Sequence, residues 1–134
     1  MKEGWLGDEY LILFDDLEVA AFSERYALSR FLPGFQVLGL RGWDDFIVRD
    51  SQGSTFTIPT VPIDPQYLAP FAMPERVDRL GPDARFSGKI KWYVKPVLFG
   101  GDPGLAKNLI WVTPEKHAEL VQWWNDPSRF VKNS

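Results

Sequence analysis

Three short apolar runs in close succession constrain the fold more than any other feature of this sequence. They cover residues 35–40, 46–50 and 55–58, and each is long enough for one strand. The connectors at residues 41–45 and 51–54 contain glycine and polar turn-forming residues, which favours antiparallel hairpins. The pattern therefore predicts an antiparallel meander.

The last of these runs also predicts how the sheet is buried. Phe56 and Ile58 share one side of the strand, and Thr55 and Thr57 share the other, because successive side chains alternate. We therefore expect a sheet with one buried face.

Further segments extend this core. The apolar run at 10–14 predicts a strand, and Asp15-Asp16 after it predicts the start of a helix over 16–29. Thr113 followed by Pro114 predicts a second helix over 114–125, with an apolar stripe of His117, Leu120, Val121 and Trp124. Residues 89–95 and 108–112 are strand candidates. The proline-rich stretch 59–88 predicts an ordered loop with one short helix near 65–71.

Together these patterns predict one α+β domain over residues 1–134, with a single mainly antiparallel sheet flanked by the two helices. No apolar stretch is long enough to span a membrane, and the N-terminus lacks the apolar segment of a signal peptide. The chain has no cysteine, which excludes thiol chemistry and fits a cytoplasmic protein. The net charge of −3 argues against a general nucleic-acid binder, and most acidic residues fall in the first third.

The sequence offers little for catalysis or metal binding. His117 is the single histidine, and its spacing from Glu119 does not place the two side chains together on a helix, so we expect a packing or surface role. The glycine-rich segment at 99–104 lacks the ending of a phosphate-binding loop and predicts a turn. Asp15-Asp16 and Asp44-Asp45 are explained by helix capping and turn formation. We therefore predict no catalytic residue, no metal site and no cofactor.

The six tryptophans are many for 134 residues. Most would fill the core, but Trp43 stands in a polar turn, and Trp123 and Trp124 are adjacent, so one narrow helix stripe cannot bury both. Because tryptophan dominates binding hot spots, these residues favour a protein-binding surface.

Several motifs resemble the SUKH superfamily, which includes bacterial immunity proteins and fungal cell-wall assembly regulators. The resemblance covers residues 4–72. It is carried by the strand at 7–14 entering a helix, Leu32-Pro33-Gly34 before a strand ending near Gly39, the segment 45–48, the turn at 51–53 and the proline-flanked strand at 56–59. The chain departs from the family in lacking one or two leading helices and in having residues 41–45 where relatives carry a glycine-rich segment. The tail resembles those on bacterial relatives, which suggests a strand–helix extension whose last helix replaces the missing N-terminal packing.

The resemblance implies a non-enzymatic cytoplasmic protein that binds and neutralises a cognate toxin. The first alternative is a regulatory scaffold domain. A small hydrolase is a second alternative with less support. An edge strand and the adjacent tryptophans would allow a homodimer, although nothing in the sequence requires one. The predicted contact surface combines acidic residues that steer encounter with one aromatic anchor; its residues are Asp15, Asp16, Glu18, Trp43, Asp44 and Asp45.

Overall fold

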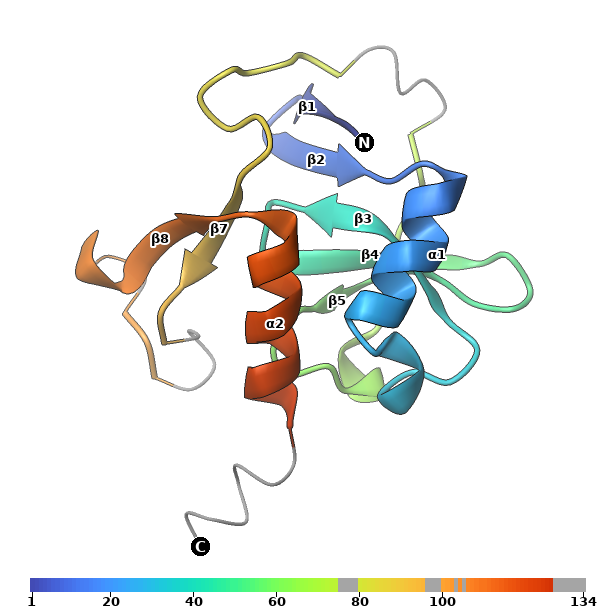
Figure 1. The fold of residues 1–134 in the computed structure, drawn as a ribbon. Helices are drawn as coiled ribbons and strands as arrows, with labels where there is room; N and C mark the ends of the chain where they lie inside the picture. The colour runs from blue at the N-terminus through green and yellow to red at the C-terminus, as the bar shows by residue number, and fades with distance from the viewer. Residues whose placement is uncertain (75–79, 96–99, 103, 105, 127–134) are drawn as a thin grey trace, which may run out of the picture.

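A computed structural model describes residues 1–74, 80–95, 100–102, 104 and 106–126. Its main unit is a six-stranded antiparallel sheet in which the strands lie in chain order, from β1 to β6 (Figure 1). These strands are β1 Lys2–Leu6, β2 Glu9–Leu13, β3 Gln36–Arg41, β4 Asp45–Arg49, β5 Thr55–Pro59 and β6 Ala69–Pro70.

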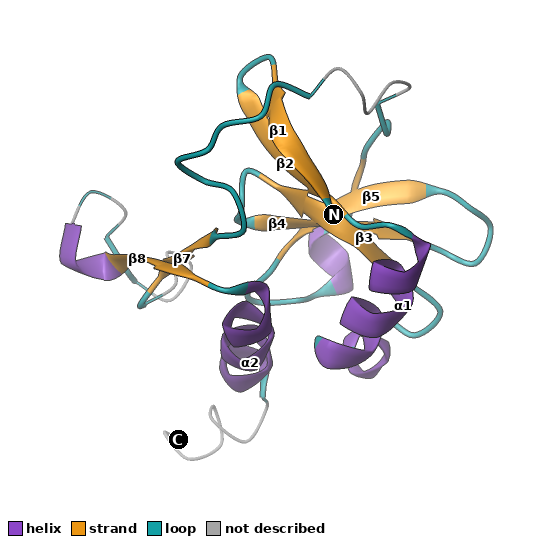
Figure 2. Cartoon of the chain, turned by 45° about the horizontal axis from the view of Figure 1, so that its top comes forward, coloured by secondary structure: helices purple, strands orange, loops and turns teal. Residues whose placement is uncertain are grey.

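A second, two-stranded sheet pairs β7 (Ile90–Tyr93) with β8 (Leu109–Val112). Two α-helices complete the fold, α1 over Asp16–Arg25 and α2 over Pro114–Asn125, and both lie on the same side of the large sheet (Figure 2). In the described part of the chain, short 3₁₀ turns at Leu28–Arg30, Pro65–Tyr67 and Ala106–Asn108 join these elements. The predicted α+β class and the antiparallel meander are confirmed, but the strands form two sheets rather than one.

Two expectations about local structure need correction. The helix predicted over 16–29 ends at Arg25, because Ala27 adopts a left-handed conformation with φ of 53° and the chain continues as a 3₁₀ turn. Strand β1 was not expected, since its sequence shows no clear alternation. Of the glycine-rich turn predicted at 99–104, residues 99 and 103 lie outside the described residues.

The large sheet is buried on both faces, so the prediction of one buried face is wrong. The helix-facing cluster includes Tyr10 and Ile12 of β2, whereas Leu11 and Leu13 belong to a cluster on the other side. That second cluster is completed by Phe71, Met73 and Leu80 from the proline-rich stretch. This stretch is held at the sheet edge by paired backbone hydrogen bonds of 2.8 Å between Trp5 and Gly81. The segment predicted to be an ordered loop therefore covers a hydrophobic face of the sheet.

The predicted stripe on α2 packs against the core, its four residues to different extents. Val121 and His117 are fully buried as expected, but Leu120 and Trp124 are only partly buried. Asn125 is buried instead, and its amide donates to the carbonyl oxygens of Thr60 and Val121 and accepts from the Ile63 N–H at 2.7 Å. The end of α2 is thus fastened to the segment that follows β5.

Candidate functional site

The first predicted acidic group lies at the start of α1. Asp15 is the N-cap: its carboxylate accepts from the Glu18 N–H at 2.8 Å, and the Glu18 carboxylate accepts from the Asp15 N–H at 3.0 Å. The backbone hydrogen bond from Glu18 is the main reason that the pKa of Asp15 is lowered. Asp15 and Glu18 therefore hold the helix end, whereas Asp16 is exposed.

The second predicted acidic group lies in and beside the turn between β3 and β4. Asp44 lies 3.7 Å from the Lys91 Nζ, and Asp45 lies 3.9 Å from the Arg41 guanidinium. Partial burial raises the pKa of both carboxyl groups, against the opposing effect of these two cations. Both acids thus already engage cations of this chain.

The structure does not bring the two acidic groups together. In the β2–β3 pairing Leu13 lies opposite Gly39 and Leu11 opposite Arg41, so Asp15 follows one end of β2 and the 41–45 turn lies at the other. Four residues of strand separate these ends, roughly 13 Å at about 3.3 Å per residue. The predicted surface is therefore two separate patches.

Trp43 is not an exposed aromatic anchor. Its backbone is left-handed, with φ of 64°, and its ring folds back to stack on Tyr10 at a centroid distance of 4.8 Å, which leaves only 9% of the residue exposed. The Lys91 Nζ lies 5.3 Å from the centre of the same ring. Trp43 belongs to an aromatic cluster with Trp5, Tyr10, Phe86 and Trp111. It therefore stabilises the junction between the two sheets.

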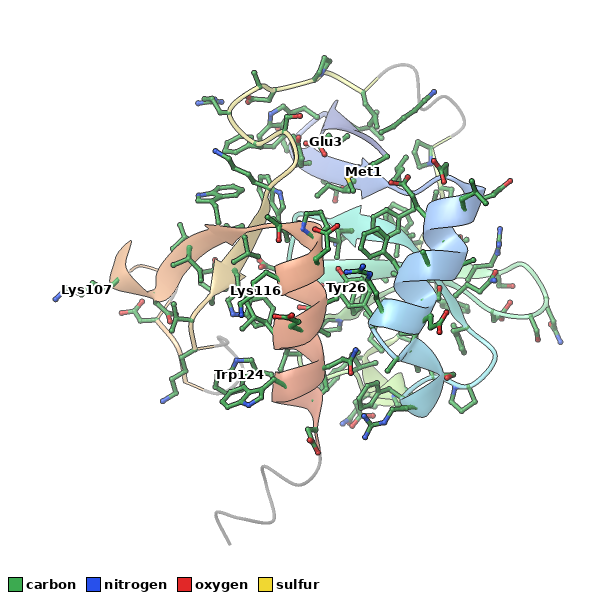
Figure 3. All side chains as sticks on the ribbon, in the orientation of Figure 1. Met1, Glu3, Tyr26, Lys107, Lys116 and Trp124 are labelled. Carbon is green, nitrogen blue, oxygen red and sulfur yellow. The ribbon has the colours of Figure 1, made fainter. Side chains whose placement is uncertain are left out.

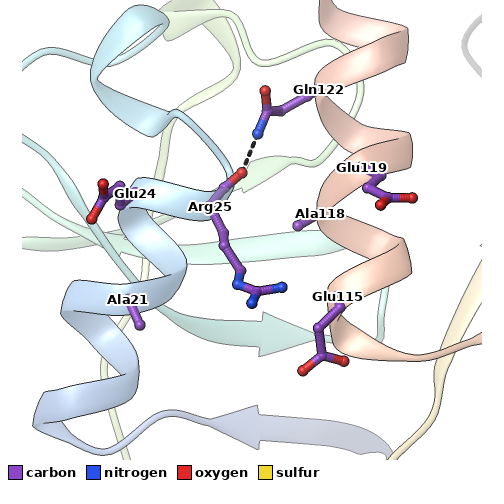
Figure 4. Close-up of a pocket in the computed structure, with 7 residues that line it drawn as sticks. All are labelled: Ala21, Glu24, Arg25, Glu115, Ala118, Glu119 and Gln122. Carbon is purple, nitrogen blue, oxygen red and sulfur yellow. Dashed lines mark hydrogen bonds between the residues drawn. The ribbon is translucent and has the colours of Figure 1, made fainter.

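A groove of about 540 Å³ lies between α1 and α2. Both helices contribute a small side chain to its lining, Ala21 from α1 and Ala118 from α2 (Figure 4). The Gln122 side-chain amide donates to the Arg25 carbonyl oxygen and ties the helices together at one end. Small residues thus open the groove, and one side-chain hydrogen bond fixes its width.

Acidic side chains dominate the groove. Glu24 comes from α1, and Glu115 and Glu119 come from α2, against one lining cation, Arg25, whose guanidinium reaches into the groove from α1 (Figure 4). Glu119 also pairs with Lys116 at 3.2 Å. The lining residues are therefore negative in net charge, but the Glu24 and Glu119 carboxylates point away from the space between the helices, where the Arg25 guanidinium and Glu115 lie (Figure 4).

The sequence predicted Trp43 as an exposed aromatic anchor, but the exposed apolar side chain near the groove is Leu17. It is 84% exposed, lies between Asp16 and Glu18, and stands one turn before the groove residue Ala21. The signal was present in the sequence, since Val19, Phe22 and Tyr26 mark the inward face of this helix at intervals of three and four residues. Leu17 falls outside that face.

The single histidine, His117 of α2, points into the protein, toward the end of α1 and toward both sheets. His117 is fully buried, with its ring near those of Tyr26, Phe46 and Trp92, and its Nδ1 lies 2.6 Å from the Tyr26 hydroxyl oxygen. Figure 3 shows Tyr26 between the two helices. Since the Tyr26 hydroxyl has no other acceptor among the described residues, it donates to Nδ1 and the ring proton stays on Nε2, which has no partner there. Of the packing or surface role expected for His117, the structure shows the packing role.

Acid is expected to destabilise the protein through this histidine. Burial lowers the pKa of His117 from 6.5 to about 3, so between these values the unfolded chain binds a proton that the folded chain rejects. The free energy of unfolding therefore falls as the pH drops from about 6.5 toward 3, by up to about 1.4 kcal/mol per pH unit. Urea unfolding at pH 7.5 and pH 5 measures this loss.

The matched variant replaces both partners, as Tyr26→Phe with His117→Leu, so that no buried polar group is left alone. Its stability should depend less on pH in the same window, while contributions from Asp44 and Asp45 stay common to both proteins. An equally steep acid loss in the double variant would contradict this assignment.

Within the described ranges, no three histidine or carboxylate side chains gather closely enough to hold a metal ion. No helix there is long and apolar enough to cross a membrane. Comparison of the chain with protein family models, with curated proteins and with solved structures gives no match in any of the three.

Proposed function

We propose that this protein is a non-enzymatic immunity protein that binds a cognate toxin through the acidic face formed by α1 and α2. The observation that carries the proposal is the groove between the helices, whose lining residues include three glutamates, with the exposed Leu17 one turn before the lining residue Ala21. The motif resemblance to the SUKH superfamily supports the same class of function.

The chemistry of this face suits a basic protein partner. Glu24, Glu115 and Asp16 attract a positive surface over a distance, which accelerates encounter and makes it depend on salt. Leu17 offers an apolar contact that can be dehydrated on binding, and such contacts supply much of the affinity of an interface. A basic surface of the toxin would lie across the two helices, over the outward-directed carboxylates of Glu24 and Glu119.

An enzymatic function has weaker support. The single histidine points into the core and hydrogen-bonds Tyr26, so it is out of reach of a substrate in the groove. The groove itself holds carboxylates and one guanidinium without a hydroxyl nucleophile among its lining residues. These groups recognise charge more readily than they perform acid–base or nucleophilic chemistry.

Binding kinetics with a toxin encoded beside this gene test the proposal. Charge reversal in a double variant, Asp16→Lys with Glu24→Lys, should slow association about tenfold or more at low salt and weaken its salt dependence. Leu17→Ala should instead accelerate dissociation, at a cost of about 1–2 kcal/mol in binding free energy. Surface plasmon resonance at two salt concentrations separates these effects.

Asp8→Lys provides the control, because it reverses an exposed charge in the turn between β1 and β2, at the sheet end away from α1. It should change the association rate little. Equal slowing by the control and the double variant would locate binding at the other acidic patch, which contains Asp44 and Asp45. Absence of binding by the unaltered protein to every neighbouring toxin would favour the scaffold function.

A further inference from the structure

The outer edge of β8 is an unprotected strand edge. Among the described residues β8 pairs with β7 alone, and both views place it at the margin of the molecule, on the side of α2 away from α1 (Figures 1 and 2). Ile110 is 40% exposed and Trp111 is 38% exposed. An open apolar edge of this kind is a template for pairing with another strand.

The register identifies the backbone groups on this edge. The Val94 N–H donates to the Asn108 carbonyl oxygen at 2.8 Å, which makes Val94 and Asn108 a hydrogen-bonded pair. Such pairs alternate along an antiparallel ladder, so Ile110 and Val112 also direct their backbone groups toward β7. Leu109 and Trp111 therefore direct theirs outward, where no other described residue accepts or donates.

The two strands differ in how they resist pairing. Strand β7 contains Lys91 and is flanked by Lys89 and Lys95, which is a common protection of an edge. Strand β8 reads Leu-Ile-Trp-Val, with no charge, no proline and no break in its register with β7. Only β8 is free of a charged side chain that a neighbouring strand would have to accommodate.

We propose that two copies of this chain associate by antiparallel pairing of β8 with β8, about a two-fold axis that passes beside Ile110. Leu109 of each copy then lies opposite Trp111 of the other, and their outward backbone groups form four hydrogen bonds. The two Ile110 side chains face each other as a non-hydrogen-bonded pair, the closer kind of cross-strand contact. The product is a continuous four-stranded sheet in the order β7-β8-β8-β7.

A second copy fits this edge because the strand is complementary to itself. Under the two-fold, Asn108 lies opposite Val112 and Lys107 lies opposite Thr113, so no like charges meet. On one face the two Ile110 residues cover each other, and on the other face each Trp111 covers a leucine. Pairing also stabilises the β7–β8 sheet by extending it to four strands, since a sheet of two strands alone is marginally stable.

Sedimentation of the full chain tests the pairing. The average mass should rise from 15.4 kDa toward twice that value as the concentration increases from about 1 µM to about 1 mM, as expected for a short interface. Ile110→Lys places two ammonium groups opposite each other and should raise the dissociation constant at least about tenfold. Leu17→Lys makes the same change at an exposed leucine of α1 and should leave the dimer intact, with both variants folded by circular dichroism.

A disulfide cross-link tests the register directly. The chain has no cysteine, so Ile110→Cys introduces a single thiol that can react only with its counterpart in another copy. Opposed Cβ atoms of a non-hydrogen-bonded pair are about 4.5–5.5 Å apart, close to disulfide geometry. Mild oxidation should link Ile110→Cys much faster than Leu17→Cys. A monomer at every concentration, a dimer unaffected by Ile110→Lys, or equal linking rates for the two cysteine variants would each overturn the proposal.

Discussion

A chain that ends at Lys107 is expected to stay unfolded or to aggregate. The deletion removes β8 and α2, and with them the buried side chains of His117, Ala118 and Val121. It also removes the Asn125 amide, which leaves the Ile63 N–H and the Thr60 carbonyl without their partners. Each buried side chain contributes up to about 1.5–3 kcal/mol and each orphaned polar group costs about 1–3 kcal/mol. The total is comparable with the whole stability of a domain, about 5–15 kcal/mol.

Size-exclusion chromatography and thermal melting followed by circular dichroism check this expectation. Val121→Asp tests the same contact in a chain of normal length, because it places a carboxylate at a fully buried position of α2. Lys116→Asp introduces the same side chain in the exposed first turn of α2, where a negative charge is favourable, and should melt near the unaltered protein. A soluble truncated chain with the full-length melting temperature would show that α2 is dispensable.

Gly39→Ala is expected to prevent folding or to lower the free energy of unfolding by more than about 4 kcal/mol. A Cβ atom at this position would lie 1.9 Å from the Ile12 carbonyl oxygen, a backbone atom in the neighbouring strand. Gly39 lies where the register of β3 against β4 shifts, and it pairs with Leu13 on the other side. The central strand would have to separate from β2 to accommodate one methyl group.

Gly53→Ala is the matched control for this variant. Gly53 has a positive φ of 86° in the turn between β4 and β5, but nothing lies within 4 Å of an added Cβ. Its cost should be confined to backbone strain of about 1–2 kcal/mol. Chemical unfolding of both variants compares them, and a similar small loss for the two glycines would show that β2 and β3 are not as closely packed as described.

Elements with a strong local signal could be predicted from the sequence. The strand positions of the meander follow from short apolar runs between glycine turns, and α2 begins at the capping residue Thr113 and ends at Asn125 as expected. Strand β1 was missed because its pairing with β2, and not its own pattern, makes it a strand. The first helix ends early because Ala27 has a left-handed backbone conformation. Nothing in the sequence indicates this, since alanine rarely adopts that conformation.

The candidate site was harder to predict because it depends on contacts between distant parts of the chain. The capping role of Asp15 and Glu18 is local and was partly foreseen, but the groove requires α1 and α2 to lie side by side, about 90 residues apart in sequence. Trp43 seemed available to a partner only because its sequence neighbours are polar. Its real neighbours, Tyr10 and Trp111, come from β2 and β8.

The chain order of the large sheet also sets an order of events during synthesis. Every strand from β1 to β6 pairs with its neighbour in sequence, so the meander can form from nearby segments as they leave the ribosome. Helix α2, which covers the helix-facing side beside α1, follows more than 40 residues later, a delay of a few seconds at about 5–20 residues per second. During that interval Phe46 of the sheet and Tyr26 at the end of α1 lack the contact with His117 that covers them in the folded protein.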